Sequence, residues 1–566
     1  MASIWQKIID FFRRFKGKTP YMDSKRFKIW INWHKSIHVG GAVDRLYTPF
    51  NKFNNNAALI PGKEFIPGLL GLKKIISDAA KAGAKVRAYG SKWSLNNIAY
   101  TKSFLINSKQ LGFYQIGIDE DSQVTDAYRS KKESLTFFQC GVGVKALNVA
   151  LTNKGQALKT SGASDGQTMV GAISTGTHGS AHAVGAMTEY VKGIHLVLEG
   201  KHVFLQRESD QAVTDEFSSW LDNAVPILDD DMFNAALVSF GCFGLIHGLL
   251  IETEPIYNLE LFINNYDFSE VKRAFTSLHM EGLKLPHGNE LPFHFEVALN
   301  PYRIGDGEKG AFVRVYYKSA IGEVHDHALG LGDTSEHDIH TAVAETFDES
   351  THDKLSELEN DLAGTEKKNE LLKVIGDAVQ IALELSFKKT TTLEPKPPSA
   401  YFTSDSSTNP TSSVPISATS LELGCPLSQI EKMVDLIVQT THEHPFAAPL
   451  ALRYVKKSSA TIGFTGLEDI TVTLEMPGPY GHILFPKTGE GHKALFEALA
   501  ASDIHHSYHW GQQLPENPQW VRQAYGDRID QWKAKREELL GPSGIEMFST
   551  PFTDSFLVDS VDPPMV

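Results

Sequence analysis

The sequence predicts an α+β fold with more than one domain. Its 566 residues are too many for one ordinary hydrophobic core. Strand-like and helical stretches also follow one another without the regular βα alternation of a parallel α/β protein. A third observation concerns function, because the segment Ser161–Ser180 (SGASDGQTMVGAISTGTHGS) is rich in glycine and small hydroxyl residues around His178.

This glycine-rich segment is typical of a loop that surrounds and contacts a large, flat, polar cofactor. Glycine lets the backbone approach a ligand closely, and small hydroxyls form hydrogen bonds without bulk. The alternative is a tight turn system between two strands, which explains two or three of the glycines but not the whole run.

Composition narrows the class of protein. Hydrophobic content of 42% and charged content of 22% are those of a soluble globular protein, and a formal net charge of −14 argues against a nucleic-acid partner. Cys140, Cys242 and Cys425 lack metal-ligand or redox spacing, so we expect buried thiols in a reducing compartment, the cytoplasm. No run of 18 apolar residues is present to span a bilayer.

Residues 1–45 are expected to form an N-terminal amphipathic helix and a segment that connects it to the first domain. Aromatic and aliphatic residues recur at helical spacing over 3–16, basic residues lie between them, and Gly17 and Pro20 supply a stop. Such a helix either lies in a membrane interface or packs on protein. It lacks the apolar region and cleavage site of a signal peptide.

Residues 46–255 are expected to form the first full domain. A helix is predicted over 68–84, followed by a strand at 86–89 and a loop at 90–96. Further strands are predicted at 104–106, 114–118, 135–141, 194–198 and 201–205, with helices at 144–154 and 210–222. A second glycine cluster, at 239–246, precedes another apolar run.

Residues 256–500 are expected to form a second domain, and 501–566 a segment that packs back on the first. Strands are predicted at 293–298, 311–317, 450–455 and 470–476, and helices at 355–385 and 527–540. The Ser-, Thr- and Pro-rich stretch 390–419 is predicted to be a mobile loop or lid.

Three separated pieces carry a family resemblance: YGSKWSLNN at Tyr89–Asn97, GQTMVGAISTGTHGS at Gly166–Ser180, and SFGCFGLIHG at Ser239–Gly248. Their order and spacing resemble the PCMH-type FAD-binding domain of the vanillyl-alcohol oxidase family, in its alditol, aldonolactone and sterol oxidase branch. The tail, from His509-Trp510-Gly511 onward, resembles the closing segment of that branch. The resemblance implies a two-subdomain FAD-binding domain and a substrate domain with an antiparallel sheet flanked by helices.

The resemblance also implies which residues contact FAD. The first loop would hold the pyrophosphate, the second would follow the ribityl chain and isoalloxazine, and the third would meet the adenine side. Carried over by position, these residues are Tyr89, Gly90, Ser91, Lys92, Trp93, Ser94, Gly162, Gly166, Gly171, Ser174, Thr175, Gly176, His178, Gly179, Gly244 and Ile246. No GxGxxG fingerprint follows a first strand, so a Rossmann site is disfavoured.

The chain departs from the family pattern at the flavin attachment point. Many members attach flavin covalently through a histidine in a Gly-x-x-His-Ser pattern, and this chain has Trp93 at that position. An indole offers no nucleophilic ring nitrogen, so we predict FAD bound non-covalently.

The substrate site departs as well. The family's Glu-x-Arg reads Ala451-Leu452-Arg453, and its His-Trp-Gly-Lys ends in Gln512. Alcohol oxidation needs a base and a charge partner beside the flavin. The candidate catalytic residues are Arg453, His509, Glu475 and Glu296, with Tyr508 as a further base. Glu296 has the alternative of a structural pair with Arg303 or Arg314, and His509 that of a packed tail residue.

The predicted function is FAD-dependent oxidation of a CH–OH group, as an alcohol oxidase or dehydrogenase. The partners are a small or medium organic alcohol and dioxygen or an electron carrier. The alternative is a non-catalytic or degenerate FAD-binding protein with a role in binding or assembly. No metal site is predicted, because the HxH and HxxH spacings among residues 325–340 lack a cysteine and fit a solvated loop better than zinc.

Overall fold

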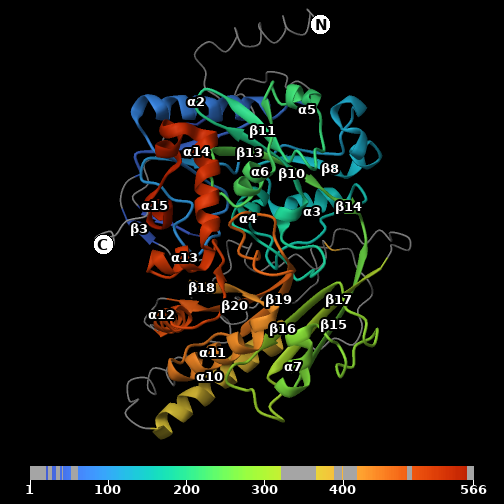
Figure 1. Cartoon of the computed structure of the whole chain (residues 1–566), viewed down its shortest axis with the longest axis vertical. Helices are drawn as coiled ribbons and strands as arrows, with labels where there is room; N and C mark the ends of the chain where they lie inside the picture. The colour runs from blue at the N-terminus through green and yellow to red at the C-terminus, as the bar shows by residue number, and fades with distance from the viewer. Residues whose placement is uncertain are drawn as a thin grey trace, which may run out of the picture.

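The computed structural model describes residues 21–22, 29–32, 38–40, 43–51, 62–319, 365–387, 398, 417–480 and 487–557. Two halves lie along its long axis (Figure 1). The upper half holds the chain up to about residue 255 together with the C-terminal helices, and the lower half holds the chain between them. The predicted helix over 3–16, the histidines of 325–340 and nearly all of the 390–419 loop lie outside the described residues.

A small sheet in the upper half has the order β1-β4-β6-β5. Its strands β4, β6 and β5 are parallel, so their carboxyl ends lie at one edge, where the loop after β5 begins. Helix α2 packs on this half through an apolar face, and Gly83 ends the helix with φ 58°. The bounds are β1 Tyr21–Met22, β4 Arg45–Pro49, β5 Val86–Tyr89, β6 Phe104–Asn107 and α2 Ile66–Ala82, with β2 Ile29–Ile31 and β3 His38–Gly40 forming a separate pair.

A larger sheet in the upper half has the order β12-β11-β10-β13-β8-β7. Only its β11–β12 pair is parallel. The central strand β10 is buried along its whole length because the sheet is covered on both faces. The bounds are β7 Tyr114–Ile116, β8 Leu135–Gln139, β10 Val191–Val197, β11 His202–Gln206, β12 Val225–Leu228, β13 Leu245–Glu252, α3 Val144–Thr152, α4 Met169–Ser174, α5 Asp215–Trp220 and α6 Asp230–Leu237, with β9 Gln156–Ala157 pairing β14 Glu254–Pro255.

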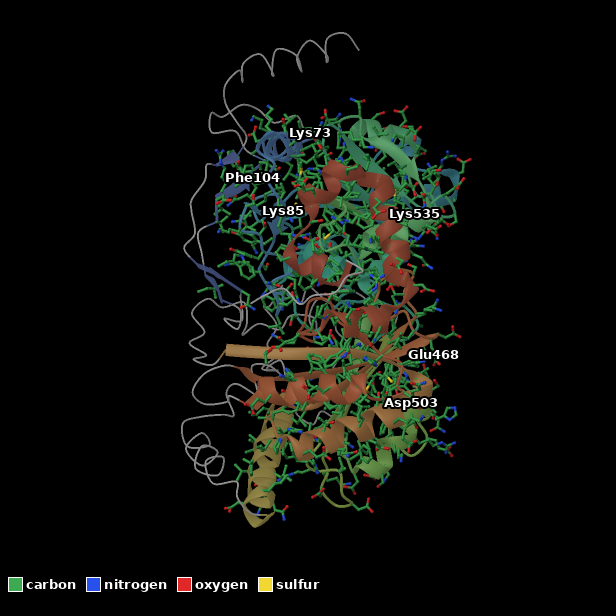
Figure 2. The ribbon with its side chains drawn as sticks, turned by 60° about the vertical axis from the view of Figure 1, so that its left-hand side comes forward. Lys73, Lys85, Phe104, Glu468, Asp503 and Lys535 are labelled. Atoms are coloured by element: carbon green, nitrogen blue, oxygen red, sulfur yellow. The ribbon has the colours of Figure 1, made fainter. Side chains whose placement is uncertain are left out.

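An antiparallel sheet of order β15-β17-β16-β19-β20-β18-β21 forms the layer of the lower half that faces the upper half. Figure 2 shows it nearly edge-on, with the upper half above it and a layer of helices below. The bounds are β15 Asn258–Tyr266, β16 His294–Leu299, β17 Ala311–Ser319, β18 Ser417–Pro426, β19 Leu450–Lys456, β20 Ile470–Tyr480, β21 Ser507–Tyr508, α7 Phe268–Ser277, α10 Thr365–Ser386, α11 Ile430–Glu443 and α12 Lys487–Ala500.

The C-terminal segment returns to the upper half, where α14 lies near α2 and α6 (Figure 1). Its elements are α13 Pro518–Tyr525, α14 Asp527–Phe548 and α15 Pro551–Leu557. Gly541 has φ 64° and interrupts α14 at the place where the sequence predicts the helix to end. Trp532 is fully buried and anchors α14 by donating its indole N–H to the carbonyl of Val238, 3.0 Å away.

The mixture of helix and antiparallel sheet agrees with the predicted α+β class. Most predicted elements differ from the observed ones by one to three residues at an end. The helix predicted over 210–222 is shorter, Asp215–Trp220, and β18 begins inside the stretch predicted to be a loop. All three cysteines are buried and unpaired, as predicted.

Candidate functional site

A pocket lies where the three glycine-rich segments meet the sheet of the lower half. Most of the predicted cofactor residues line it: Tyr89, Gly90, Ser91, Lys92, Trp93, Ser94, Gly162, Gly171, Ser174, Thr175, His178, Gly244 and Ile246. Gly166, Gly176 and Gly179 are not among the lining residues. The structure therefore brings segments about 150 residues apart in sequence to one cavity.

The glycines outside the lining have a packing role. A Cβ at Gly166 would lie 2.2 Å from the Trp93 ring, so the glycine makes room for the indole. A Cβ at Gly179 would lie 2.5 Å from the carbonyl oxygen of Ser161. Gly176 has φ 84°, which a side chain rarely tolerates.

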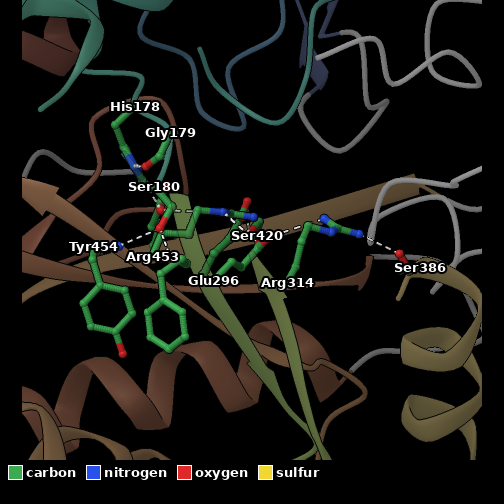
Figure 3. Close-up of polar contacts among 12 residues, drawn as sticks. His178, Gly179, Ser180, Glu296, Arg314, Ser386, Ser420, Arg453 and Tyr454 are labelled. Atoms are coloured by element: carbon green, nitrogen blue, oxygen red, sulfur yellow. Dashed lines mark hydrogen bonds and ion pairs between the residues drawn. The ribbon is translucent and has the colours of Figure 1, made fainter. Parts of the chain in front are cut away.

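Ser180 joins the second glycine-rich segment to the lower sheet. Its hydroxyl donates to the carbonyl of Phe295 and accepts the N–H of Tyr454 at 2.9 Å, and its own carbonyl accepts the N–H of Phe295 at 3.2 Å. These contacts place Ser180 beside Arg453 (Figure 3). The same contacts bring His178 over the charged side chains of the sheet.

Arg453 lies at the centre of a buried ionic cluster. Its Nε donates to Glu296 at 3.0 Å, its Nη1 donates to Glu475 at 2.7 Å, and the same Nη1 lies 3.8 Å from Glu422. The strand register creates this arrangement, because Glu296 of β16 is directly opposite Arg453 of β19, and Glu475 of β20 is opposite Glu422 of β18. Burial lowers the pKa of Arg453, but the three carboxylates outweigh it and raise that pKa above its ordinary value.

Glu296 lies behind Arg453 and does not line the pocket. Its second oxygen accepts from Arg314 at 3.2 Å, while Arg303 pairs with Asp377 instead. Burial raises the pKa of Glu296, but the two arginines outweigh it and hold that pKa below its usual range. The structural alternative considered for Glu296 thus matches its observed contacts, with Arg314 as partner.

His178 and Glu422 form a buried hydrogen-bonded pair. The Nδ1 of His178 faces the carbonyl of Gly179 at 2.8 Å and must donate to it. Its Nε2 faces Glu422 at 2.9 Å, so a hydrogen bond there requires a second proton on the pair. Burial raises the pKa of Glu422, but His178 outweighs it and holds that pKa below its ordinary value.

His509 is held as a hydrogen-bond donor. Its Nδ1 accepts the N–H of Gly511 at 3.0 Å, so the neutral ring carries its proton on Nε2. Burial lowers the pKa of His509 to about 4. The ring lines the pocket beside Phe464 and is neutral near neutral pH.

Gln512 and Glu475 form one unit on the pocket wall. The Nε2 of Gln512 donates to Glu475 at 3.1 Å, which fixes the amide orientation. The Oε1 of Gln512 is then a buried acceptor that finds no partner in the described part of the chain. It is available to a hydroxyl or N–H inside the pocket.

Sequence reasoning missed Glu422 and the role of Gln512, and it overrated Tyr508. Glu422 lies on β18, whose alternation Ser-Leu-Glu-Leu-Gly-Cys was the available signal, but the Ser-rich stretch before it hid the strand. Tyr508 does not line the pocket, and its hydroxyl contacts His506 at 2.9 Å.

Two negative findings apply to the described residues only. They contain no group of three or more His, Cys, Asp and Glu side chains that could hold a metal ion. None of their helices is both long enough and apolar enough to cross a membrane.

The chain is similar to known flavoproteins in one part of its sequence. A family model described as an FAD binding domain matches residues 71–204. L-gulono-1,4-lactone dehydrogenase of Mycobacterium tuberculosis is 27% identical over 232 residues, 41% of this chain and 44% of that protein. D-arabinono-1,4-lactone oxidase of Yarrowia lipolytica is 24% identical over 213 residues, 37% of this chain and 34% of that protein.

Two further comparisons extend this result. Long-chain alcohol oxidase of an uncultured marine euryarchaeote is 25% identical over 250 residues, 44% of this chain and 45% of that protein. The match therefore spans less than half the length of these relatives. Cholesterol oxidase from B. sterolicum has a TM-score of 0.62 at 11% identity, with 94% of this chain and 98% of that chain covered, which shows a shared fold.

The resemblance inferred from the three glycine-rich segments is confirmed: this chain contains an FAD binding domain, and its relatives are aldonolactone and long-chain alcohol oxidoreductases.

Proposed function

We propose that this protein is an FAD-dependent oxidoreductase that oxidises a CH–OH group of an organic substrate. The observation that carries the proposal is the single pocket between the FAD-binding segments and the cluster around Arg453. In this proposal residues 46–255 and 501–566 hold the cofactor, and 256–500 hold the substrate. Dioxygen or another acceptor takes the electrons from the reduced cofactor.

The lining residues fit FAD chemically. The loop Gly90–Ser94 offers backbone amides and hydroxyls to a diphosphate, and Ser174 and Thr175 offer hydroxyls to a polyol chain. The buried Oε1 of Gln512 is an acceptor for an N–H or hydroxyl. Trp93 occupies the attachment position without a nucleophilic nitrogen, which supports non-covalent binding. When bound, FAD supplies the acceptor for the hydride.

Glu475 is the proposed proton acceptor. Glu296 does not line the pocket and is held by two arginines. Glu422 is already engaged by the hydrogen bond with His178. Glu475 lines the pocket and accepts hydrogen bonds from Arg453 and Gln512, and we assign to its carboxylate the acceptance of the hydroxyl proton.

The other polar groups orient the substrate. His509 donates from Nε2 to the substrate oxygen, and Gln512 accepts from a neighbouring hydroxyl through Oε1. Arg453 holds Glu475 in place through a hydrogen bond and balances negative charge that develops on the substrate oxygen. The bound substrate displaces water from these groups, which strengthens each of the interactions.

The first experiment is an absorbance spectrum of the purified protein, repeated on the supernatant after acid precipitation. Flavin bands that move into the supernatant are expected for non-covalent FAD. Flavin left in the pellet contradicts the assignment of Trp93, and a protein that takes up no added FAD contradicts the whole proposal. A screen of alcohols for anaerobic bleaching follows, and the absence of any reducing alcohol favours the non-catalytic alternative.

The second experiment exchanges Glu475 for Gln. Flavin reduction by the best alcohol is expected to slow by about 10²–10⁴-fold, the usual contribution of a positioned base. The matched control is Glu516→Gln, an exposed residue, which should leave the rate unchanged. An unaltered rate in the Glu475 variant, with FAD still bound, removes this residue from the mechanism.

A further inference from the structure

Two buried arginines lie behind the pocket without a carboxylate partner. Arg87 of β5 is 1% exposed and Arg536 of α14 is 3% exposed. Within the described ranges neither forms an ion pair, although buried guanidinium groups are almost always paired with an acid. In addition, the Nε of Arg87 finds no hydrogen-bond partner among those residues.

Neutral groups surround both guanidinium groups. Arg87 donates to the carbonyl of Phe240, to the Thr550 hydroxyl at 3.2 Å and to the Phe548 carbonyl at 3.4 Å. Arg536 donates to the Cys242 carbonyl and the Ser549 hydroxyl, each at 2.9 Å. These contacts fix both side chains, but they leave two positive charges uncompensated.

Both arginines hold the same turn, residues 240–243, from its outer side. Phe240 has φ 49° and Gly241 has φ 76°, both in the left-handed region. Because the peptide group is planar and trans, the N–H of Gly241 points away from the Phe240 carbonyl that Arg87 holds. Phe240 and Gly241 line the pocket, so the turn that both arginines hold forms part of the pocket wall.

The nearest acids do not neutralise the pair. Burial lowers the pKa of Arg536, and the charge of Arg87 lowers it further, while Cys242 opposes this most and Asp554 and Glu537 oppose it less. Asp554 is paired with Lys85 at 3.6 Å, and Glu537 is exposed. The turn that both arginines contact lines the pocket, so their charges lie close to the pocket wall.

We propose that Arg87 and Arg536 form a buried cation pair that supplies the counter-charge for the diphosphate of FAD, acting through the turn 240–243 without touching the cofactor. This inference rests on the proposed FAD site. Ionic attraction in a region of low dielectric constant acts over a longer range than a hydrogen bond. The loop Gly90–Ser94, which follows β5, makes the contacts with the diphosphate, and the arginines behind the turn 240–243 select an anionic ligand.

The test measures the affinity of the apoprotein for FAD and for riboflavin, which lacks the phosphates. Arg87→Met and Arg536→Met are expected to weaken FAD binding by about tenfold or more and riboflavin binding by less than about threefold. Arg87→Lys and Arg536→Lys keep the charge and should restore most of the FAD affinity. Thermal unfolding of each apoprotein serves as a readout of folding that does not depend on the cofactor.

The chain offers a matched control in Arg528, on the same helix α14. Arg528 is half-buried, donates to the Gly463 carbonyl at 3.2 Å, and within the described residues forms no hydrogen bond with the turn 240–243. Arg528→Met should leave both affinities unchanged. A wild-type apoprotein that binds no FAD contradicts the proposed function itself, a result distinct from failure of this inference.

Three results overturn the inference. The first is FAD affinity unchanged in both Met variants, and the second is an equal loss for FAD and riboflavin, which would show a purely geometric role for the turn. The third concerns Cys242, whose Sγ lies 3.4 Å and 3.5 Å from the Arg87 nitrogens. If Cys242→Ser tightens FAD binding about tenfold, a thiolate is the existing counter-charge. If a Met variant does not fold, the Lys variant decides, because the proposal requires it to bind FAD nearly as wild type.

Discussion

Two buried polar networks of this protein differ in charge and in position. The first is a chain of imidazoles, His195, His202 and His247, within the large sheet of the upper half. The second is the ionic cluster around Arg453 in the lower sheet. Both contain deeply buried titratable groups with displaced pKa values, but only the second opens on the pocket.

The imidazole chain is neutral, and its protons are all assigned. Gln139 accepts from Asn51 at 2.6 Å through Oε1, so its Nε2 donates to His247 at 2.8 Å. His247 then carries its proton on Nδ1 and donates to His195 at 2.9 Å, which donates in turn to His202 at 2.9 Å. Each nitrogen between Gln139 and His202 has its one partner, so the network requires no ligand.

The ionic cluster is built from charged groups instead. Arg314 and Arg453 carry two positive charges, and Glu296, Glu422 and Glu475 carry three negative charges. The proton that His178 shares with Glu422 brings the sum to zero. The comparison teaches that burial and a displaced pKa do not by themselves mark an active site. An unsatisfied atom facing a pocket and a proton that can leave are the stronger signals.

Breaking the ionic cluster at its centre gives the largest expected effect. Arg453→Met leaves Glu296, Glu475 and Glu422 without their shared partner, and removal of one member of a buried ion pair costs about 3–5 kcal/mol. Flavin reduction should also slow by at least about tenfold, because the charge partner of Glu475 is lost. Thermal unfolding and anaerobic stopped-flow measurements check the two effects separately.

The control for this variant is Arg303→Met. Arg303 pairs with Asp377, and both side chains are partly exposed, so solvent screening limits the loss to below about 1 kcal/mol. Equal destabilisation by the two variants would contradict the claim that the cluster around Arg453 differs from an ordinary ion pair.

Removing only the proton between Glu422 and His178 gives a smaller and more specific effect. In Glu422→Gln the new amide donates to the Nε2 of a neutral His178, so the contact and the zero net charge of the cluster both persist. The protein should fold and bind FAD normally. Flavin reduction should change by less than about tenfold, while its pH profile should lose one ionisation. A profile that keeps every ionisation would show that this pair does not titrate in the reaction.

The sequence predicted the cofactor side of the pocket better than the substrate side. The glycine pattern of Ser161–Ser180 is a local property, because backbone approach and positive φ are fixed by residue type, and most residues carried over from it line the pocket. The cluster around Arg453 depends on register between strands far apart in the chain. Periodicity finds such strands but not which residues are opposite one another.

Individual residues show the same limit. Glu296 and Glu475 were both predicted as catalytic from their strands, but only the fold shows that Arg453 separates Glu296 from the pocket. His509 was predicted as a candidate base, and only the fold shows that a backbone N–H two residues along the chain occupies its Nδ1. Glu422 was missed because β18 begins inside a Ser-rich stretch whose composition is that of a loop.

The smallest expected effect belongs to the neutral chain, and its sign follows from the lowered pKa values. Burial lowers the pKa of His202 to about 4 and that of His247 to about 3. Below pH 6.5 these imidazoles bind protons in the unfolded protein but stay neutral in the folded protein. Their contribution to the free energy of unfolding is therefore complete above pH 6.5 and is lost as the pH falls toward 4. Each such imidazole contributes a slope of up to about 1.4 kcal/mol per pH unit.

His202→Gln removes one of these protons and keeps the chain intact, because a glutamine oxygen can accept from the Nε2 of His195. The variant should match wild type at pH 7.5 and lose stability more slowly as the pH falls to 5, with about one proton fewer taken up on unfolding. Denaturant unfolding at a series of pH values measures this. A variant with the wild-type slope would mean that His202 is already charged in the folded protein. The imidazole chain would then be charged like the cluster around Arg453, and the distinction between the two networks would be lost.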